Sequence, residues 1–440
     1  MSLETPGSAD VARSEVAATT PVRRPSLWRH ADFLKLWTAQ TISQVGDEVT
    51  QLAVPLVAIL TLGVGPFELG LLGTFQFLPF ILLTIPAGVW VDRLRRRPIL
   101  IGADIGRAVL LTSIPIAFLA GVLSIWQLYV VAFLVGCLEV FFDVAYQSYL
   151  PSVVDRDRLV EGNAKLELSA SASTVVGPSI AGFLVELLRA PIAIFFDALS
   201  YLGAIFFVFL IRRPEAPPEP HDPATGPRPS MRKEAAEGLR YVLGHRYLRY
   251  IAACTGTLNL FGNIGFTVVL LYVVEELGLT PGTIGLILAL SNLGVLTGAL
   301  TAERFGRWIG TGPTIVSSAF LGAFTLLAVA IAPREAPIPF LIVGFFIGGA
   351  MQVIYNVNQV SFRQAITPER MQGRMNATMR FIVWGTIPVG ALVGGALGGL
   401  IGLQNTIWVG AIGSFIGFLP VLLSPVRSLQ RIPSPEESAA

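Results

Sequence analysis

The chain alternates long apolar stretches with short polar turns from about residue 34 to residue 424. Each stretch has about the twenty residues that an α-helix needs to cross a hydrocarbon core of roughly 30 Å. The stretches are apolar on all sides and do not alternate at every second position, so they predict membrane-spanning helices and not a β-barrel. The twelve expected spans are 34–62, 67–91, 98–120, 124–149, 165–188, 190–211, 247–275, 281–302, 312–333, 337–362, 376–402 and 404–424.

Basic residues concentrate in one of the two sets of loops. The alternate loops contain only Arg189 and Arg334. Because Lys and Arg are enriched in cytoplasmic loops, we expect both termini and the central linker to be cytoplasmic, in a multi-pass protein of the cell inner membrane. The basic runs are 93–97, 156–158, 212–249, 304–307 and 363–374.

The segment between the sixth and seventh spans predicts the boundary between two halves. Residues 214–229 are rich in proline, which is typical of a linker, and residues 231–247 have the pattern of an amphipathic helix at the membrane surface. The expected organisation is a cytoplasmic tail (1–32), a six-helix bundle (33–211), a cytoplasmic linker (212–246), a second six-helix bundle (247–424) and a cytoplasmic tail (425–440).

Composition supports the membrane assignment, since 53% of the residues are hydrophobic and only 14% are charged. The net charge of +2, with basic residues confined to loops, does not indicate a nucleic-acid partner. No Gly-x-x-x-x-Gly-Lys-Ser/Thr loop is present, so we expect no ATP binding. Cys137 and Cys254 lie in apolar stretches, and no metal-ligand or catalytic constellation recurs, so an enzyme is not expected.

The two expected bundles repeat each other in sequence. Asp92-Arg93 after the second span lines up with Glu303-Arg304 after the eighth, at an offset of 303 − 92 = 211 residues. Arg158 after the fourth span lines up with Arg370 after the tenth, at 370 − 158 = 212. A nearly constant offset predicts a parallel repeat of six helices.

These loops resemble the loop motif of the major facilitator superfamily, over about residues 30 to 425. The first copy has Arg95 where the family has glycine, whereas the second copy keeps that residue as Gly306. The resemblance implies an all-α fold of twelve transmembrane helices in two pseudo-symmetric bundles. The motif residues are Gly88, Asp92, Arg93, Arg96 and Arg97, with Glu303, Arg304 and Arg307 in the second copy.

Three further segments are similar to exporters of that superfamily. Gly177-Pro178 with Gly182 resembles the motif of proton-coupled antiporters, while Gly46-Asp47 and Asp104 with Arg107 resemble the drug- and siderophore-exporter branch, the enterobactin-exporter-like and macrolide-efflux-like proteins. The resemblance implies export of a small organic solute in exchange for protons. The proton gradient would supply the energy without a cofactor, and we expect a monomer.

Polar residues inside the first span predict a wet face near the middle of the membrane. Gln40, Gln44, Asp47 and Gln51 follow one another at spacings of four, three and four, which places them on one face of a helix. An ionised side chain at this depth costs about 2.5–3.5 kcal/mol, so Asp47 and neighbouring Glu48 are candidates for proton coupling. The alternative is a carboxylate that pairs with an arginine between helices.

The fourth span carries a second acidic face. Glu139, Asp143 and Gln147 lie one turn apart, and two carboxylates so close repel each other, which favours proton binding. The alternative is that Asp143 pairs with loop arginines.

Other charged residues in the spans have structural explanations. Asp104 and Arg107 are three residues apart and favour an ion pair tied to the Asp92–Arg93 loop. Arg380 either reaches the headgroups or balances an acid elsewhere. Asp197 in the sixth span is a weaker candidate for a functional acid inside the membrane.

The second half offers amides where the first offers acids. Acids facing amides and aromatic residues across a cavity would suit an amphipathic or cationic organic solute. Hydrogen bonding between helices is the competing explanation for each amide. The cavity-lining candidates are Gln44, Gln51, Asn259, Asn263, Asn292, Gln352, Tyr355, Asn356 and Arg380.

Glycine and proline predict where the two halves approach each other. Gly177, Pro178 and Gly182 in the fifth span have a counterpart at Pro388 in the eleventh, and small residues let helices approach closely. The basic turn at 92–97 and its copy would hold the cytoplasmic ends together in one state. A facilitator or importer with the same fold remains the alternative function, and a receptor or enzyme would need an extramembrane domain that the sequence does not show.

Overall fold

The computed structural model describes residues 26–91, 93–155, 158–215 and 231–431, and every regular element in these ranges is a helix. The all-α membrane fold is therefore confirmed. The first half contains α1 (Ala31–Leu56), which continues as a π-helical turn at Val57–Thr61, then α2 (Pro66–Val91), α3 (Arg96–Leu119), α4 (Ile125–Val153), α5 (Leu159–Leu188) and α6 (Ala190–Phe209).

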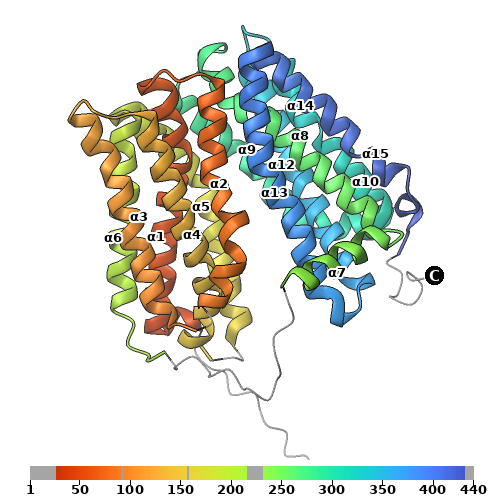
Figure 1. Cartoon of the computed structure of the whole chain (residues 1–440), viewed down its shortest axis with the longest axis horizontal. Coiled ribbons are helices and arrows are strands. Elements are labelled where there is room, and N and C mark those ends of the chain that lie inside the picture. The colour runs from red at the N-terminus through yellow and green to blue at the C-terminus, as the bar shows by residue number, and fades with distance from the viewer. Residues whose placement is uncertain (1–25, 92, 156–157, 216–230, 432–440) are drawn as a thin grey trace, which may run out of the picture.

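The second half repeats this order with two broken spans. It contains α8 (Leu248–Glu275), α9 (Pro281–Ile309), α10 (Thr311–Gly322) with α11 (Phe324–Ala330), α12 (Pro337–Ile366), α13 (Glu369–Ile401) and α14 (Leu403–Gly417) with α15 (Leu419–Leu422). Short 3-10 turns lie at Leu27–Arg29 and Pro425–Ser428. Figure 1 shows the two halves as adjacent bundles, with α7 (Met231–Gly244) beside one end of the second.

Eleven spans in the described residues are long and apolar enough to cross a membrane, counting α10 with α11 and α14 with α15 as one each. The twelfth expected span, α1, falls outside this set because its polar stripe, which includes Asp47 and Glu48, lowers its hydropathy. A helix that carries such residues needs protein or water, not lipid, on that face.

The two halves meet mainly along two helix pairs, α2 with α13 and α5 with α9, with a smaller contact between α2 and α8. Glycines face each other in both: a Cβ on Gly395 would lie 2.9 Å from the Cα of Gly70, and one on Gly285 would lie 3.0 Å from the Cα of Gly182. Backbones approach this closely only where side chains are absent. We call these two contacts the seam.

The seam lies at the end of the molecule that is opposite α7. Between described residues, hydrogen bonds join the halves only there: Thr74 Oγ1 donates to Pro388 O (3.2 Å), Asn292 Nδ2 to Thr174 O (2.6 Å), and Gly282 N to Glu186 (2.7 Å). No such bond joins the halves near α7 within the described ranges. The described helices of the two halves are therefore in contact at the seam, and Figure 1 shows them apart at the α7 end.

The helix α7 packs against the N-terminal end of α13. Glu237 forms an ion pair with Arg374 at 3.0 Å, and Gly238 lies directly against the backbone of Arg374. Val242 is fully buried at this contact. The amphipathic pattern of residues 231–247 thus corresponds to a helix held by the second half.

Candidate functional site

A cavity of about 1340 Å³ lies within the second half. Its walls come from α8, α9, α10, α11, α12, α13 and Ser414 of α14, and the first half contributes Leu52, Phe80, Ile81 and Thr84. Phe80 stacks on Trp384 of α13, with ring centroids 4.6 Å apart, and so helps to close the wall between the halves. This volume is large enough for a drug-sized organic molecule.

Seven of the nine candidates for lining a cavity lie on the walls of this one. Gln44 and Gln51 lie elsewhere on α1, and the Oε1 atom of Gln44 is buried without a hydrogen-bond partner among the described residues. The seven are Asn259, Asn263, Asn292, Gln352, Tyr355, Asn356 and Arg380.

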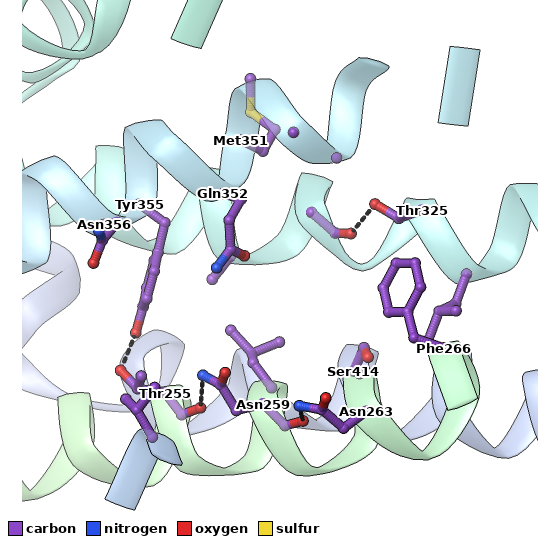
Figure 2. Close-up of a pocket in the computed structure, with 18 of the residues that line it drawn as sticks. Thr255, Asn259, Asn263, Phe266, Thr325, Met351, Gln352, Tyr355, Asn356 and Ser414 are labelled. Atoms are coloured by element: carbon purple, nitrogen blue, oxygen red, sulfur yellow. Dashed lines mark hydrogen bonds between the residues drawn. The ribbon is translucent and has the colours of Figure 1, made fainter. Parts of the chain in front are cut away.

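The amides of α8 form a ladder along the cavity (Figure 2). Asn259 Nδ2 donates to Thr255 O at 2.9 Å, and Asn263 Nδ2 donates to Asn259 O at 2.7 Å. Both bonds stay within α8, so they leave the side-chain oxygens free to accept from a solute. Asn292 differs, because its Nδ2 atom donates across the seam to the backbone oxygen of Thr174.

Tyr355 has a structural role on the opposite wall. Its hydroxyl lies 2.7 Å from Thr255 Oγ1 and 3.4 Å from Cys254 Sγ, and all three residues are buried. Figure 2 shows this bond joining α12 to α8. The pair fixes the distance between two walls of the cavity.

A polar face of α12 continues this wall toward the α7 end. It consists of Gln352, Asn356, Gln359 and Arg363, and Gln359 Nε2 donates to Asn356 Oδ1 at 3.0 Å. Sequence reasoning counted Arg363 among the loop arginines, but α12 runs to Ile366 and buries it. The spacing of four, three and four residues along this face could have revealed it.

A second polar cluster lies inside the first half, around Arg107 of α3. The guanidinium forms an ion pair with Asp104, and both residues are almost fully buried. It also lies between two aromatic rings, 4.2 Å from the centroid of Phe142 and 4.4 Å from that of Tyr201. The described contacts of Arg107 outside α3 come from α4 and α6, and the expected link of the pair to the Asp92–Arg93 loop stays a prediction, because Asp92 lies outside the described residues.

Two further aspartates join this cluster from α1 and α6. The Tyr201 hydroxyl donates to Asp47. Asp197 accepts from Thr50 and, at 3.0 Å, from Ser200. Gly46 allows this arrangement because the side chains of Asp197 and Ser200 occupy the space that a larger residue would need. Asp197, a weak candidate in the sequence, is fully buried at the centre of the cluster.

The remaining acids connect the cluster to its surroundings. Glu139 is half-buried and acted on by the charges of Asp47 and Arg107. Asp143, one turn away, is exposed, and its cationic neighbours are Arg107 and Arg380. No loop arginine of the described chain forms an ion pair with it. Glu48 packs on Gly177 of α5, next to Thr174, whose hydroxyl donates to Ala170 O at 3.1 Å.

Among the described residues, the loop-motif residues contact their own half and the first residues of the linker. Arg96 N donates to Glu215 at 2.6 Å, and Arg97 donates to Phe209 O at 2.7 Å. Arg93 and Arg304 are exposed, and Arg307 pairs with Glu303 at 3.7 Å. At Gly88, an added Cβ would meet nothing within 4 Å. Since the α7 end is open, the expected joining of these ends stays a prediction for another state.

The Gly-Pro segment of α5 lies at the seam. Pro178 O and the Cα of Gly182 face Gly285 of α9, and Gly177 faces Glu48 within the first half. On α13, Gly394 packs on Ile264 of α8 while Gly395 meets α2. Small residues therefore serve both the contact between halves and the packing within each half.

Known transporters are similar to the chain over nearly its whole length. It is 22% identical over 402 residues to macrolide efflux protein A of Streptococcus pyogenes (91% of this chain, 97% of that protein). It is 24% identical over 428 residues to the multidrug efflux pump Tap of Mycolicibacterium fortuitum (92% and 99%). The enterobactin exporter EntS of Escherichia coli O1:K1 / APEC is 25% identical over 394 residues (89% and 90%).

Solved structures share the fold. The nucleoside transporter NupG superposes with a TM-score of 0.68 at 11% identity, covering 89% of this chain and 98% of its own. A bacterial homologue of the iron transporter ferroportin in an inward-facing state gives 0.67 at 15% identity, covering 92% and 100%. The profile of one family, described as transmembrane secretion effector, matches residues 25–437. The chain therefore belongs to this family of major facilitator superfamily transporters.

Proposed function

We propose that this protein exports a small organic solute by alternating access, in exchange for protons. The observation that carries the proposal is the separation of two polar sites: a large cavity in the second half and a buried acidic cluster in the first. The relatives named for export of macrolides, drugs and enterobactin support the direction of transport.

The orientation follows from the basic loops. These loops lie at the α7 end, and Lys and Arg favour the cytoplasmic side. The seam then closes the outer side, and the cavity is accessible from the cytoplasm. An exporter loads its solute in this state, and the ferroportin homologue with a similar fold is also inward-facing.

Charge balance supports proton coupling in the first half. Asp47, Asp104, Asp197, Glu139 and Asp143 surround a single guanidinium, that of Arg107, within this half. Asp143 is exposed, but the other four are buried or half-buried, and four ionised carboxylates at this depth exceed the charge of one buried cation, so protons would neutralise some of them. This cluster therefore holds exchangeable protons inside the membrane.

A route for those protons follows the helix faces. Asp143 is exposed, Glu139 lies one turn away, and the charge of Asp47 acts on Glu139. A proton would thus pass along α4 toward α1. Both halves and the cavity belong to one chain, so a monomer suffices for transport. One charge that crosses a potential of 100 mV contributes about 2.3 kcal/mol, so the cycle needs no ATP.

The test uses the full chain reconstituted in liposomes, with an imposed pH gradient and a panel of one macrolide, one cationic dye and one anionic dye. We expect at least one solute to accumulate against its gradient when protons flow the other way. Asp47→Asn should abolish accumulation but leave downhill exchange. The matched control is Glu335→Gln, which neutralises an exposed acid in the loop between α11 and α12.

Two outcomes would contradict the proposal. Transport of a solute that never exceeds equilibrium would indicate a facilitator, and accumulation in the same direction as proton flow would indicate an importer. Undiminished accumulation by Asp47→Asn would remove Asp47 from the coupling route.

A further inference from the structure

We propose that the α7 end of the cavity binds an anionic group of the solute, with Arg363 as its main contact. The inference rests on the proposed function, because it names the class of solute that the same cavity takes. It makes the solute an apolar molecule with an acidic group, not the cationic solute that the sequence also allowed.

Among the residues that the structure describes, Arg363 is a buried cation without a partner for its guanidinium. It lies in the last turn of α12, its exposed fraction is 7%, and it lines the cavity. Its Nε atom is buried and has no hydrogen-bond partner, and no carboxylate pairs with its guanidinium among the described residues. A buried guanidinium without an anion is costly, so its position calls for a ligand that supplies one.

The charge of the whole cavity points to the same class of ligand. Its only charged lining residues in the described chain are Arg363 and Arg380, and no Asp or Glu belongs to the wall. Arg380 faces the charge of Asp143 from the first half. Arg363 therefore provides the cavity's unbalanced positive charge.

Amides beside Arg363 complete a polar end for an otherwise apolar cavity. Gln359, one turn away on α12, has a buried Oε1 atom that accepts no hydrogen bond from the described part of the chain, and Gln364 and Asn376 also line the cavity. Farther along, Phe345 and Phe266 line the cavity and stack with centroids 6.0 Å apart. An amphiphile with its acidic group at Arg363 and its apolar body toward these rings fits both parts.

The position of Arg363 at a helix end offers a competing explanation. A cation in the last turn is weakly favoured by the helix dipole. This effect gives no acceptor to the buried Nε, and the carbonyl of Arg363 already accepts from the Thr367 hydroxyl at 2.7 Å. Under this explanation, loss of the guanidinium would change stability but not ligand preference.

The test compares two dyes with the same xanthene frame and opposite charge, fluorescein and rhodamine 123. Binding to the purified full chain in detergent is followed by fluorescence anisotropy at mildly alkaline pH, where fluorescein is anionic. We expect the unaltered chain to prefer fluorescein. Arg363→Gln should weaken fluorescein binding by about ten- to a hundredfold, the range for a hydrogen bond between charged groups, and leave rhodamine 123 unaffected.

Two further variants keep the result interpretable. Arg363→Lys retains the charge and should retain most of the preference. Arg334→Gln removes an equivalent charge from an exposed residue that pairs with Glu276, away from the cavity, and should change neither dye. Elution as a monodisperse peak shows that each variant folds.

Equal binding of both dyes, preference for rhodamine 123, absence of binding by either, or unchanged fluorescein binding by Arg363→Gln would each overturn the inference. The measurement is made at equilibrium without a proton gradient. It can therefore fail while gradient-driven transport succeeds, and the reverse also holds, so the two proposals are tested separately.

Discussion

The contact between Gly395 of α13 and Gly70 of α2 should set the balance between the two states of the transporter. In Gly395→Ala, the new methyl would lie 2.7 Å from Pro66 O and 2.9 Å from the Cα of Gly70. Carbon atoms in contact prefer about 3.5–4.0 Å, so the two helices must move apart by roughly 1 Å. Such overpacking costs about 1–3 kcal/mol, and only the state with a closed seam bears it.

The expected result is a shift of about 5- to 150-fold toward the state in which the seam is open. Pulsed electron resonance between spin labels can measure it. The labels are attached at Val122, in the turn between α3 and α4, and at Glu335, in the turn between α11 and α12, and both turns lie at the seam end of their half. Cys137 and Cys254, both free thiols, are first replaced by alanine. The population at long distance should grow in Gly395→Ala.

The matched control lies one turn farther along the same helix. A Cβ on Gly399 would meet nothing within 4 Å, so Gly399→Ala adds the same methyl to α13 without touching α2. Its distance distribution should equal that of the parent chain. If the two variants behave alike, or if Gly395→Ala keeps the parent distribution, the seam does not set the balance between states.

Two other predictions concern stability. Arg107→Gln leaves Asp104 buried without its cation, which costs about 3–5 kcal/mol. The melting temperature in detergent should therefore fall by several degrees, and the double variant with Asp104→Asn should recover part of the loss. If the double variant recovers nothing, the two residues do not act as an ion pair that stabilises the fold. Burial and the charge of Arg246 hold the pKa of His245 below its usual 6.5, and its neutral Nδ1 accepts from Tyr247 N at 3.2 Å. As pH falls, His245 therefore binds a proton in the unfolded chain before it does so in the folded chain. Its contribution to the free energy of unfolding is complete above pH 6.5 and is lost as pH falls below that value. His245→Asn should narrow the difference in melting temperature between about pH 8 and about pH 5, and an unchanged difference would contradict the assignment.

The fold was accessible from the sequence because lipid leaves the backbone few choices. Apolar length predicted the spans, and the repeated loop at 92 and 303 predicted an organisation in two halves. Span ends were less accurate, since the apolar pattern fades before the helix does. The expected span 337–362 continues to Ile366, and this one extra turn moves Arg363 from a loop to the wall of the cavity.

The site could be predicted only in part from the sequence, because periodicity shows which residues share a face of one helix but not which helices pack against each other. The spacing around Asp47 showed a polar face of α1. Its partner Tyr201 lies in an apolar stretch of α6 that carries no such pattern. In the same way, the sequence placed acids and amides across one cavity, whereas the structure buries Asp197 and Asp104 inside the first half, away from that cavity.

The opposite charges of the two halves decide how the membrane potential would act on transport. If the first half carries a proton inward and Arg363 in the second half selects an anion for export, each cycle moves two charges in the same electrical sense. A potential of 100 mV then contributes about 2.3 kcal/mol for each of them, or twice the value for the proton alone. Exchange of a proton for a cation would be electroneutral, and only the pH difference would drive it. The unpaired arginine in the cavity therefore bears on the energy source as well as on the solute, because the sign of the solute's charge determines whether the membrane potential assists its export.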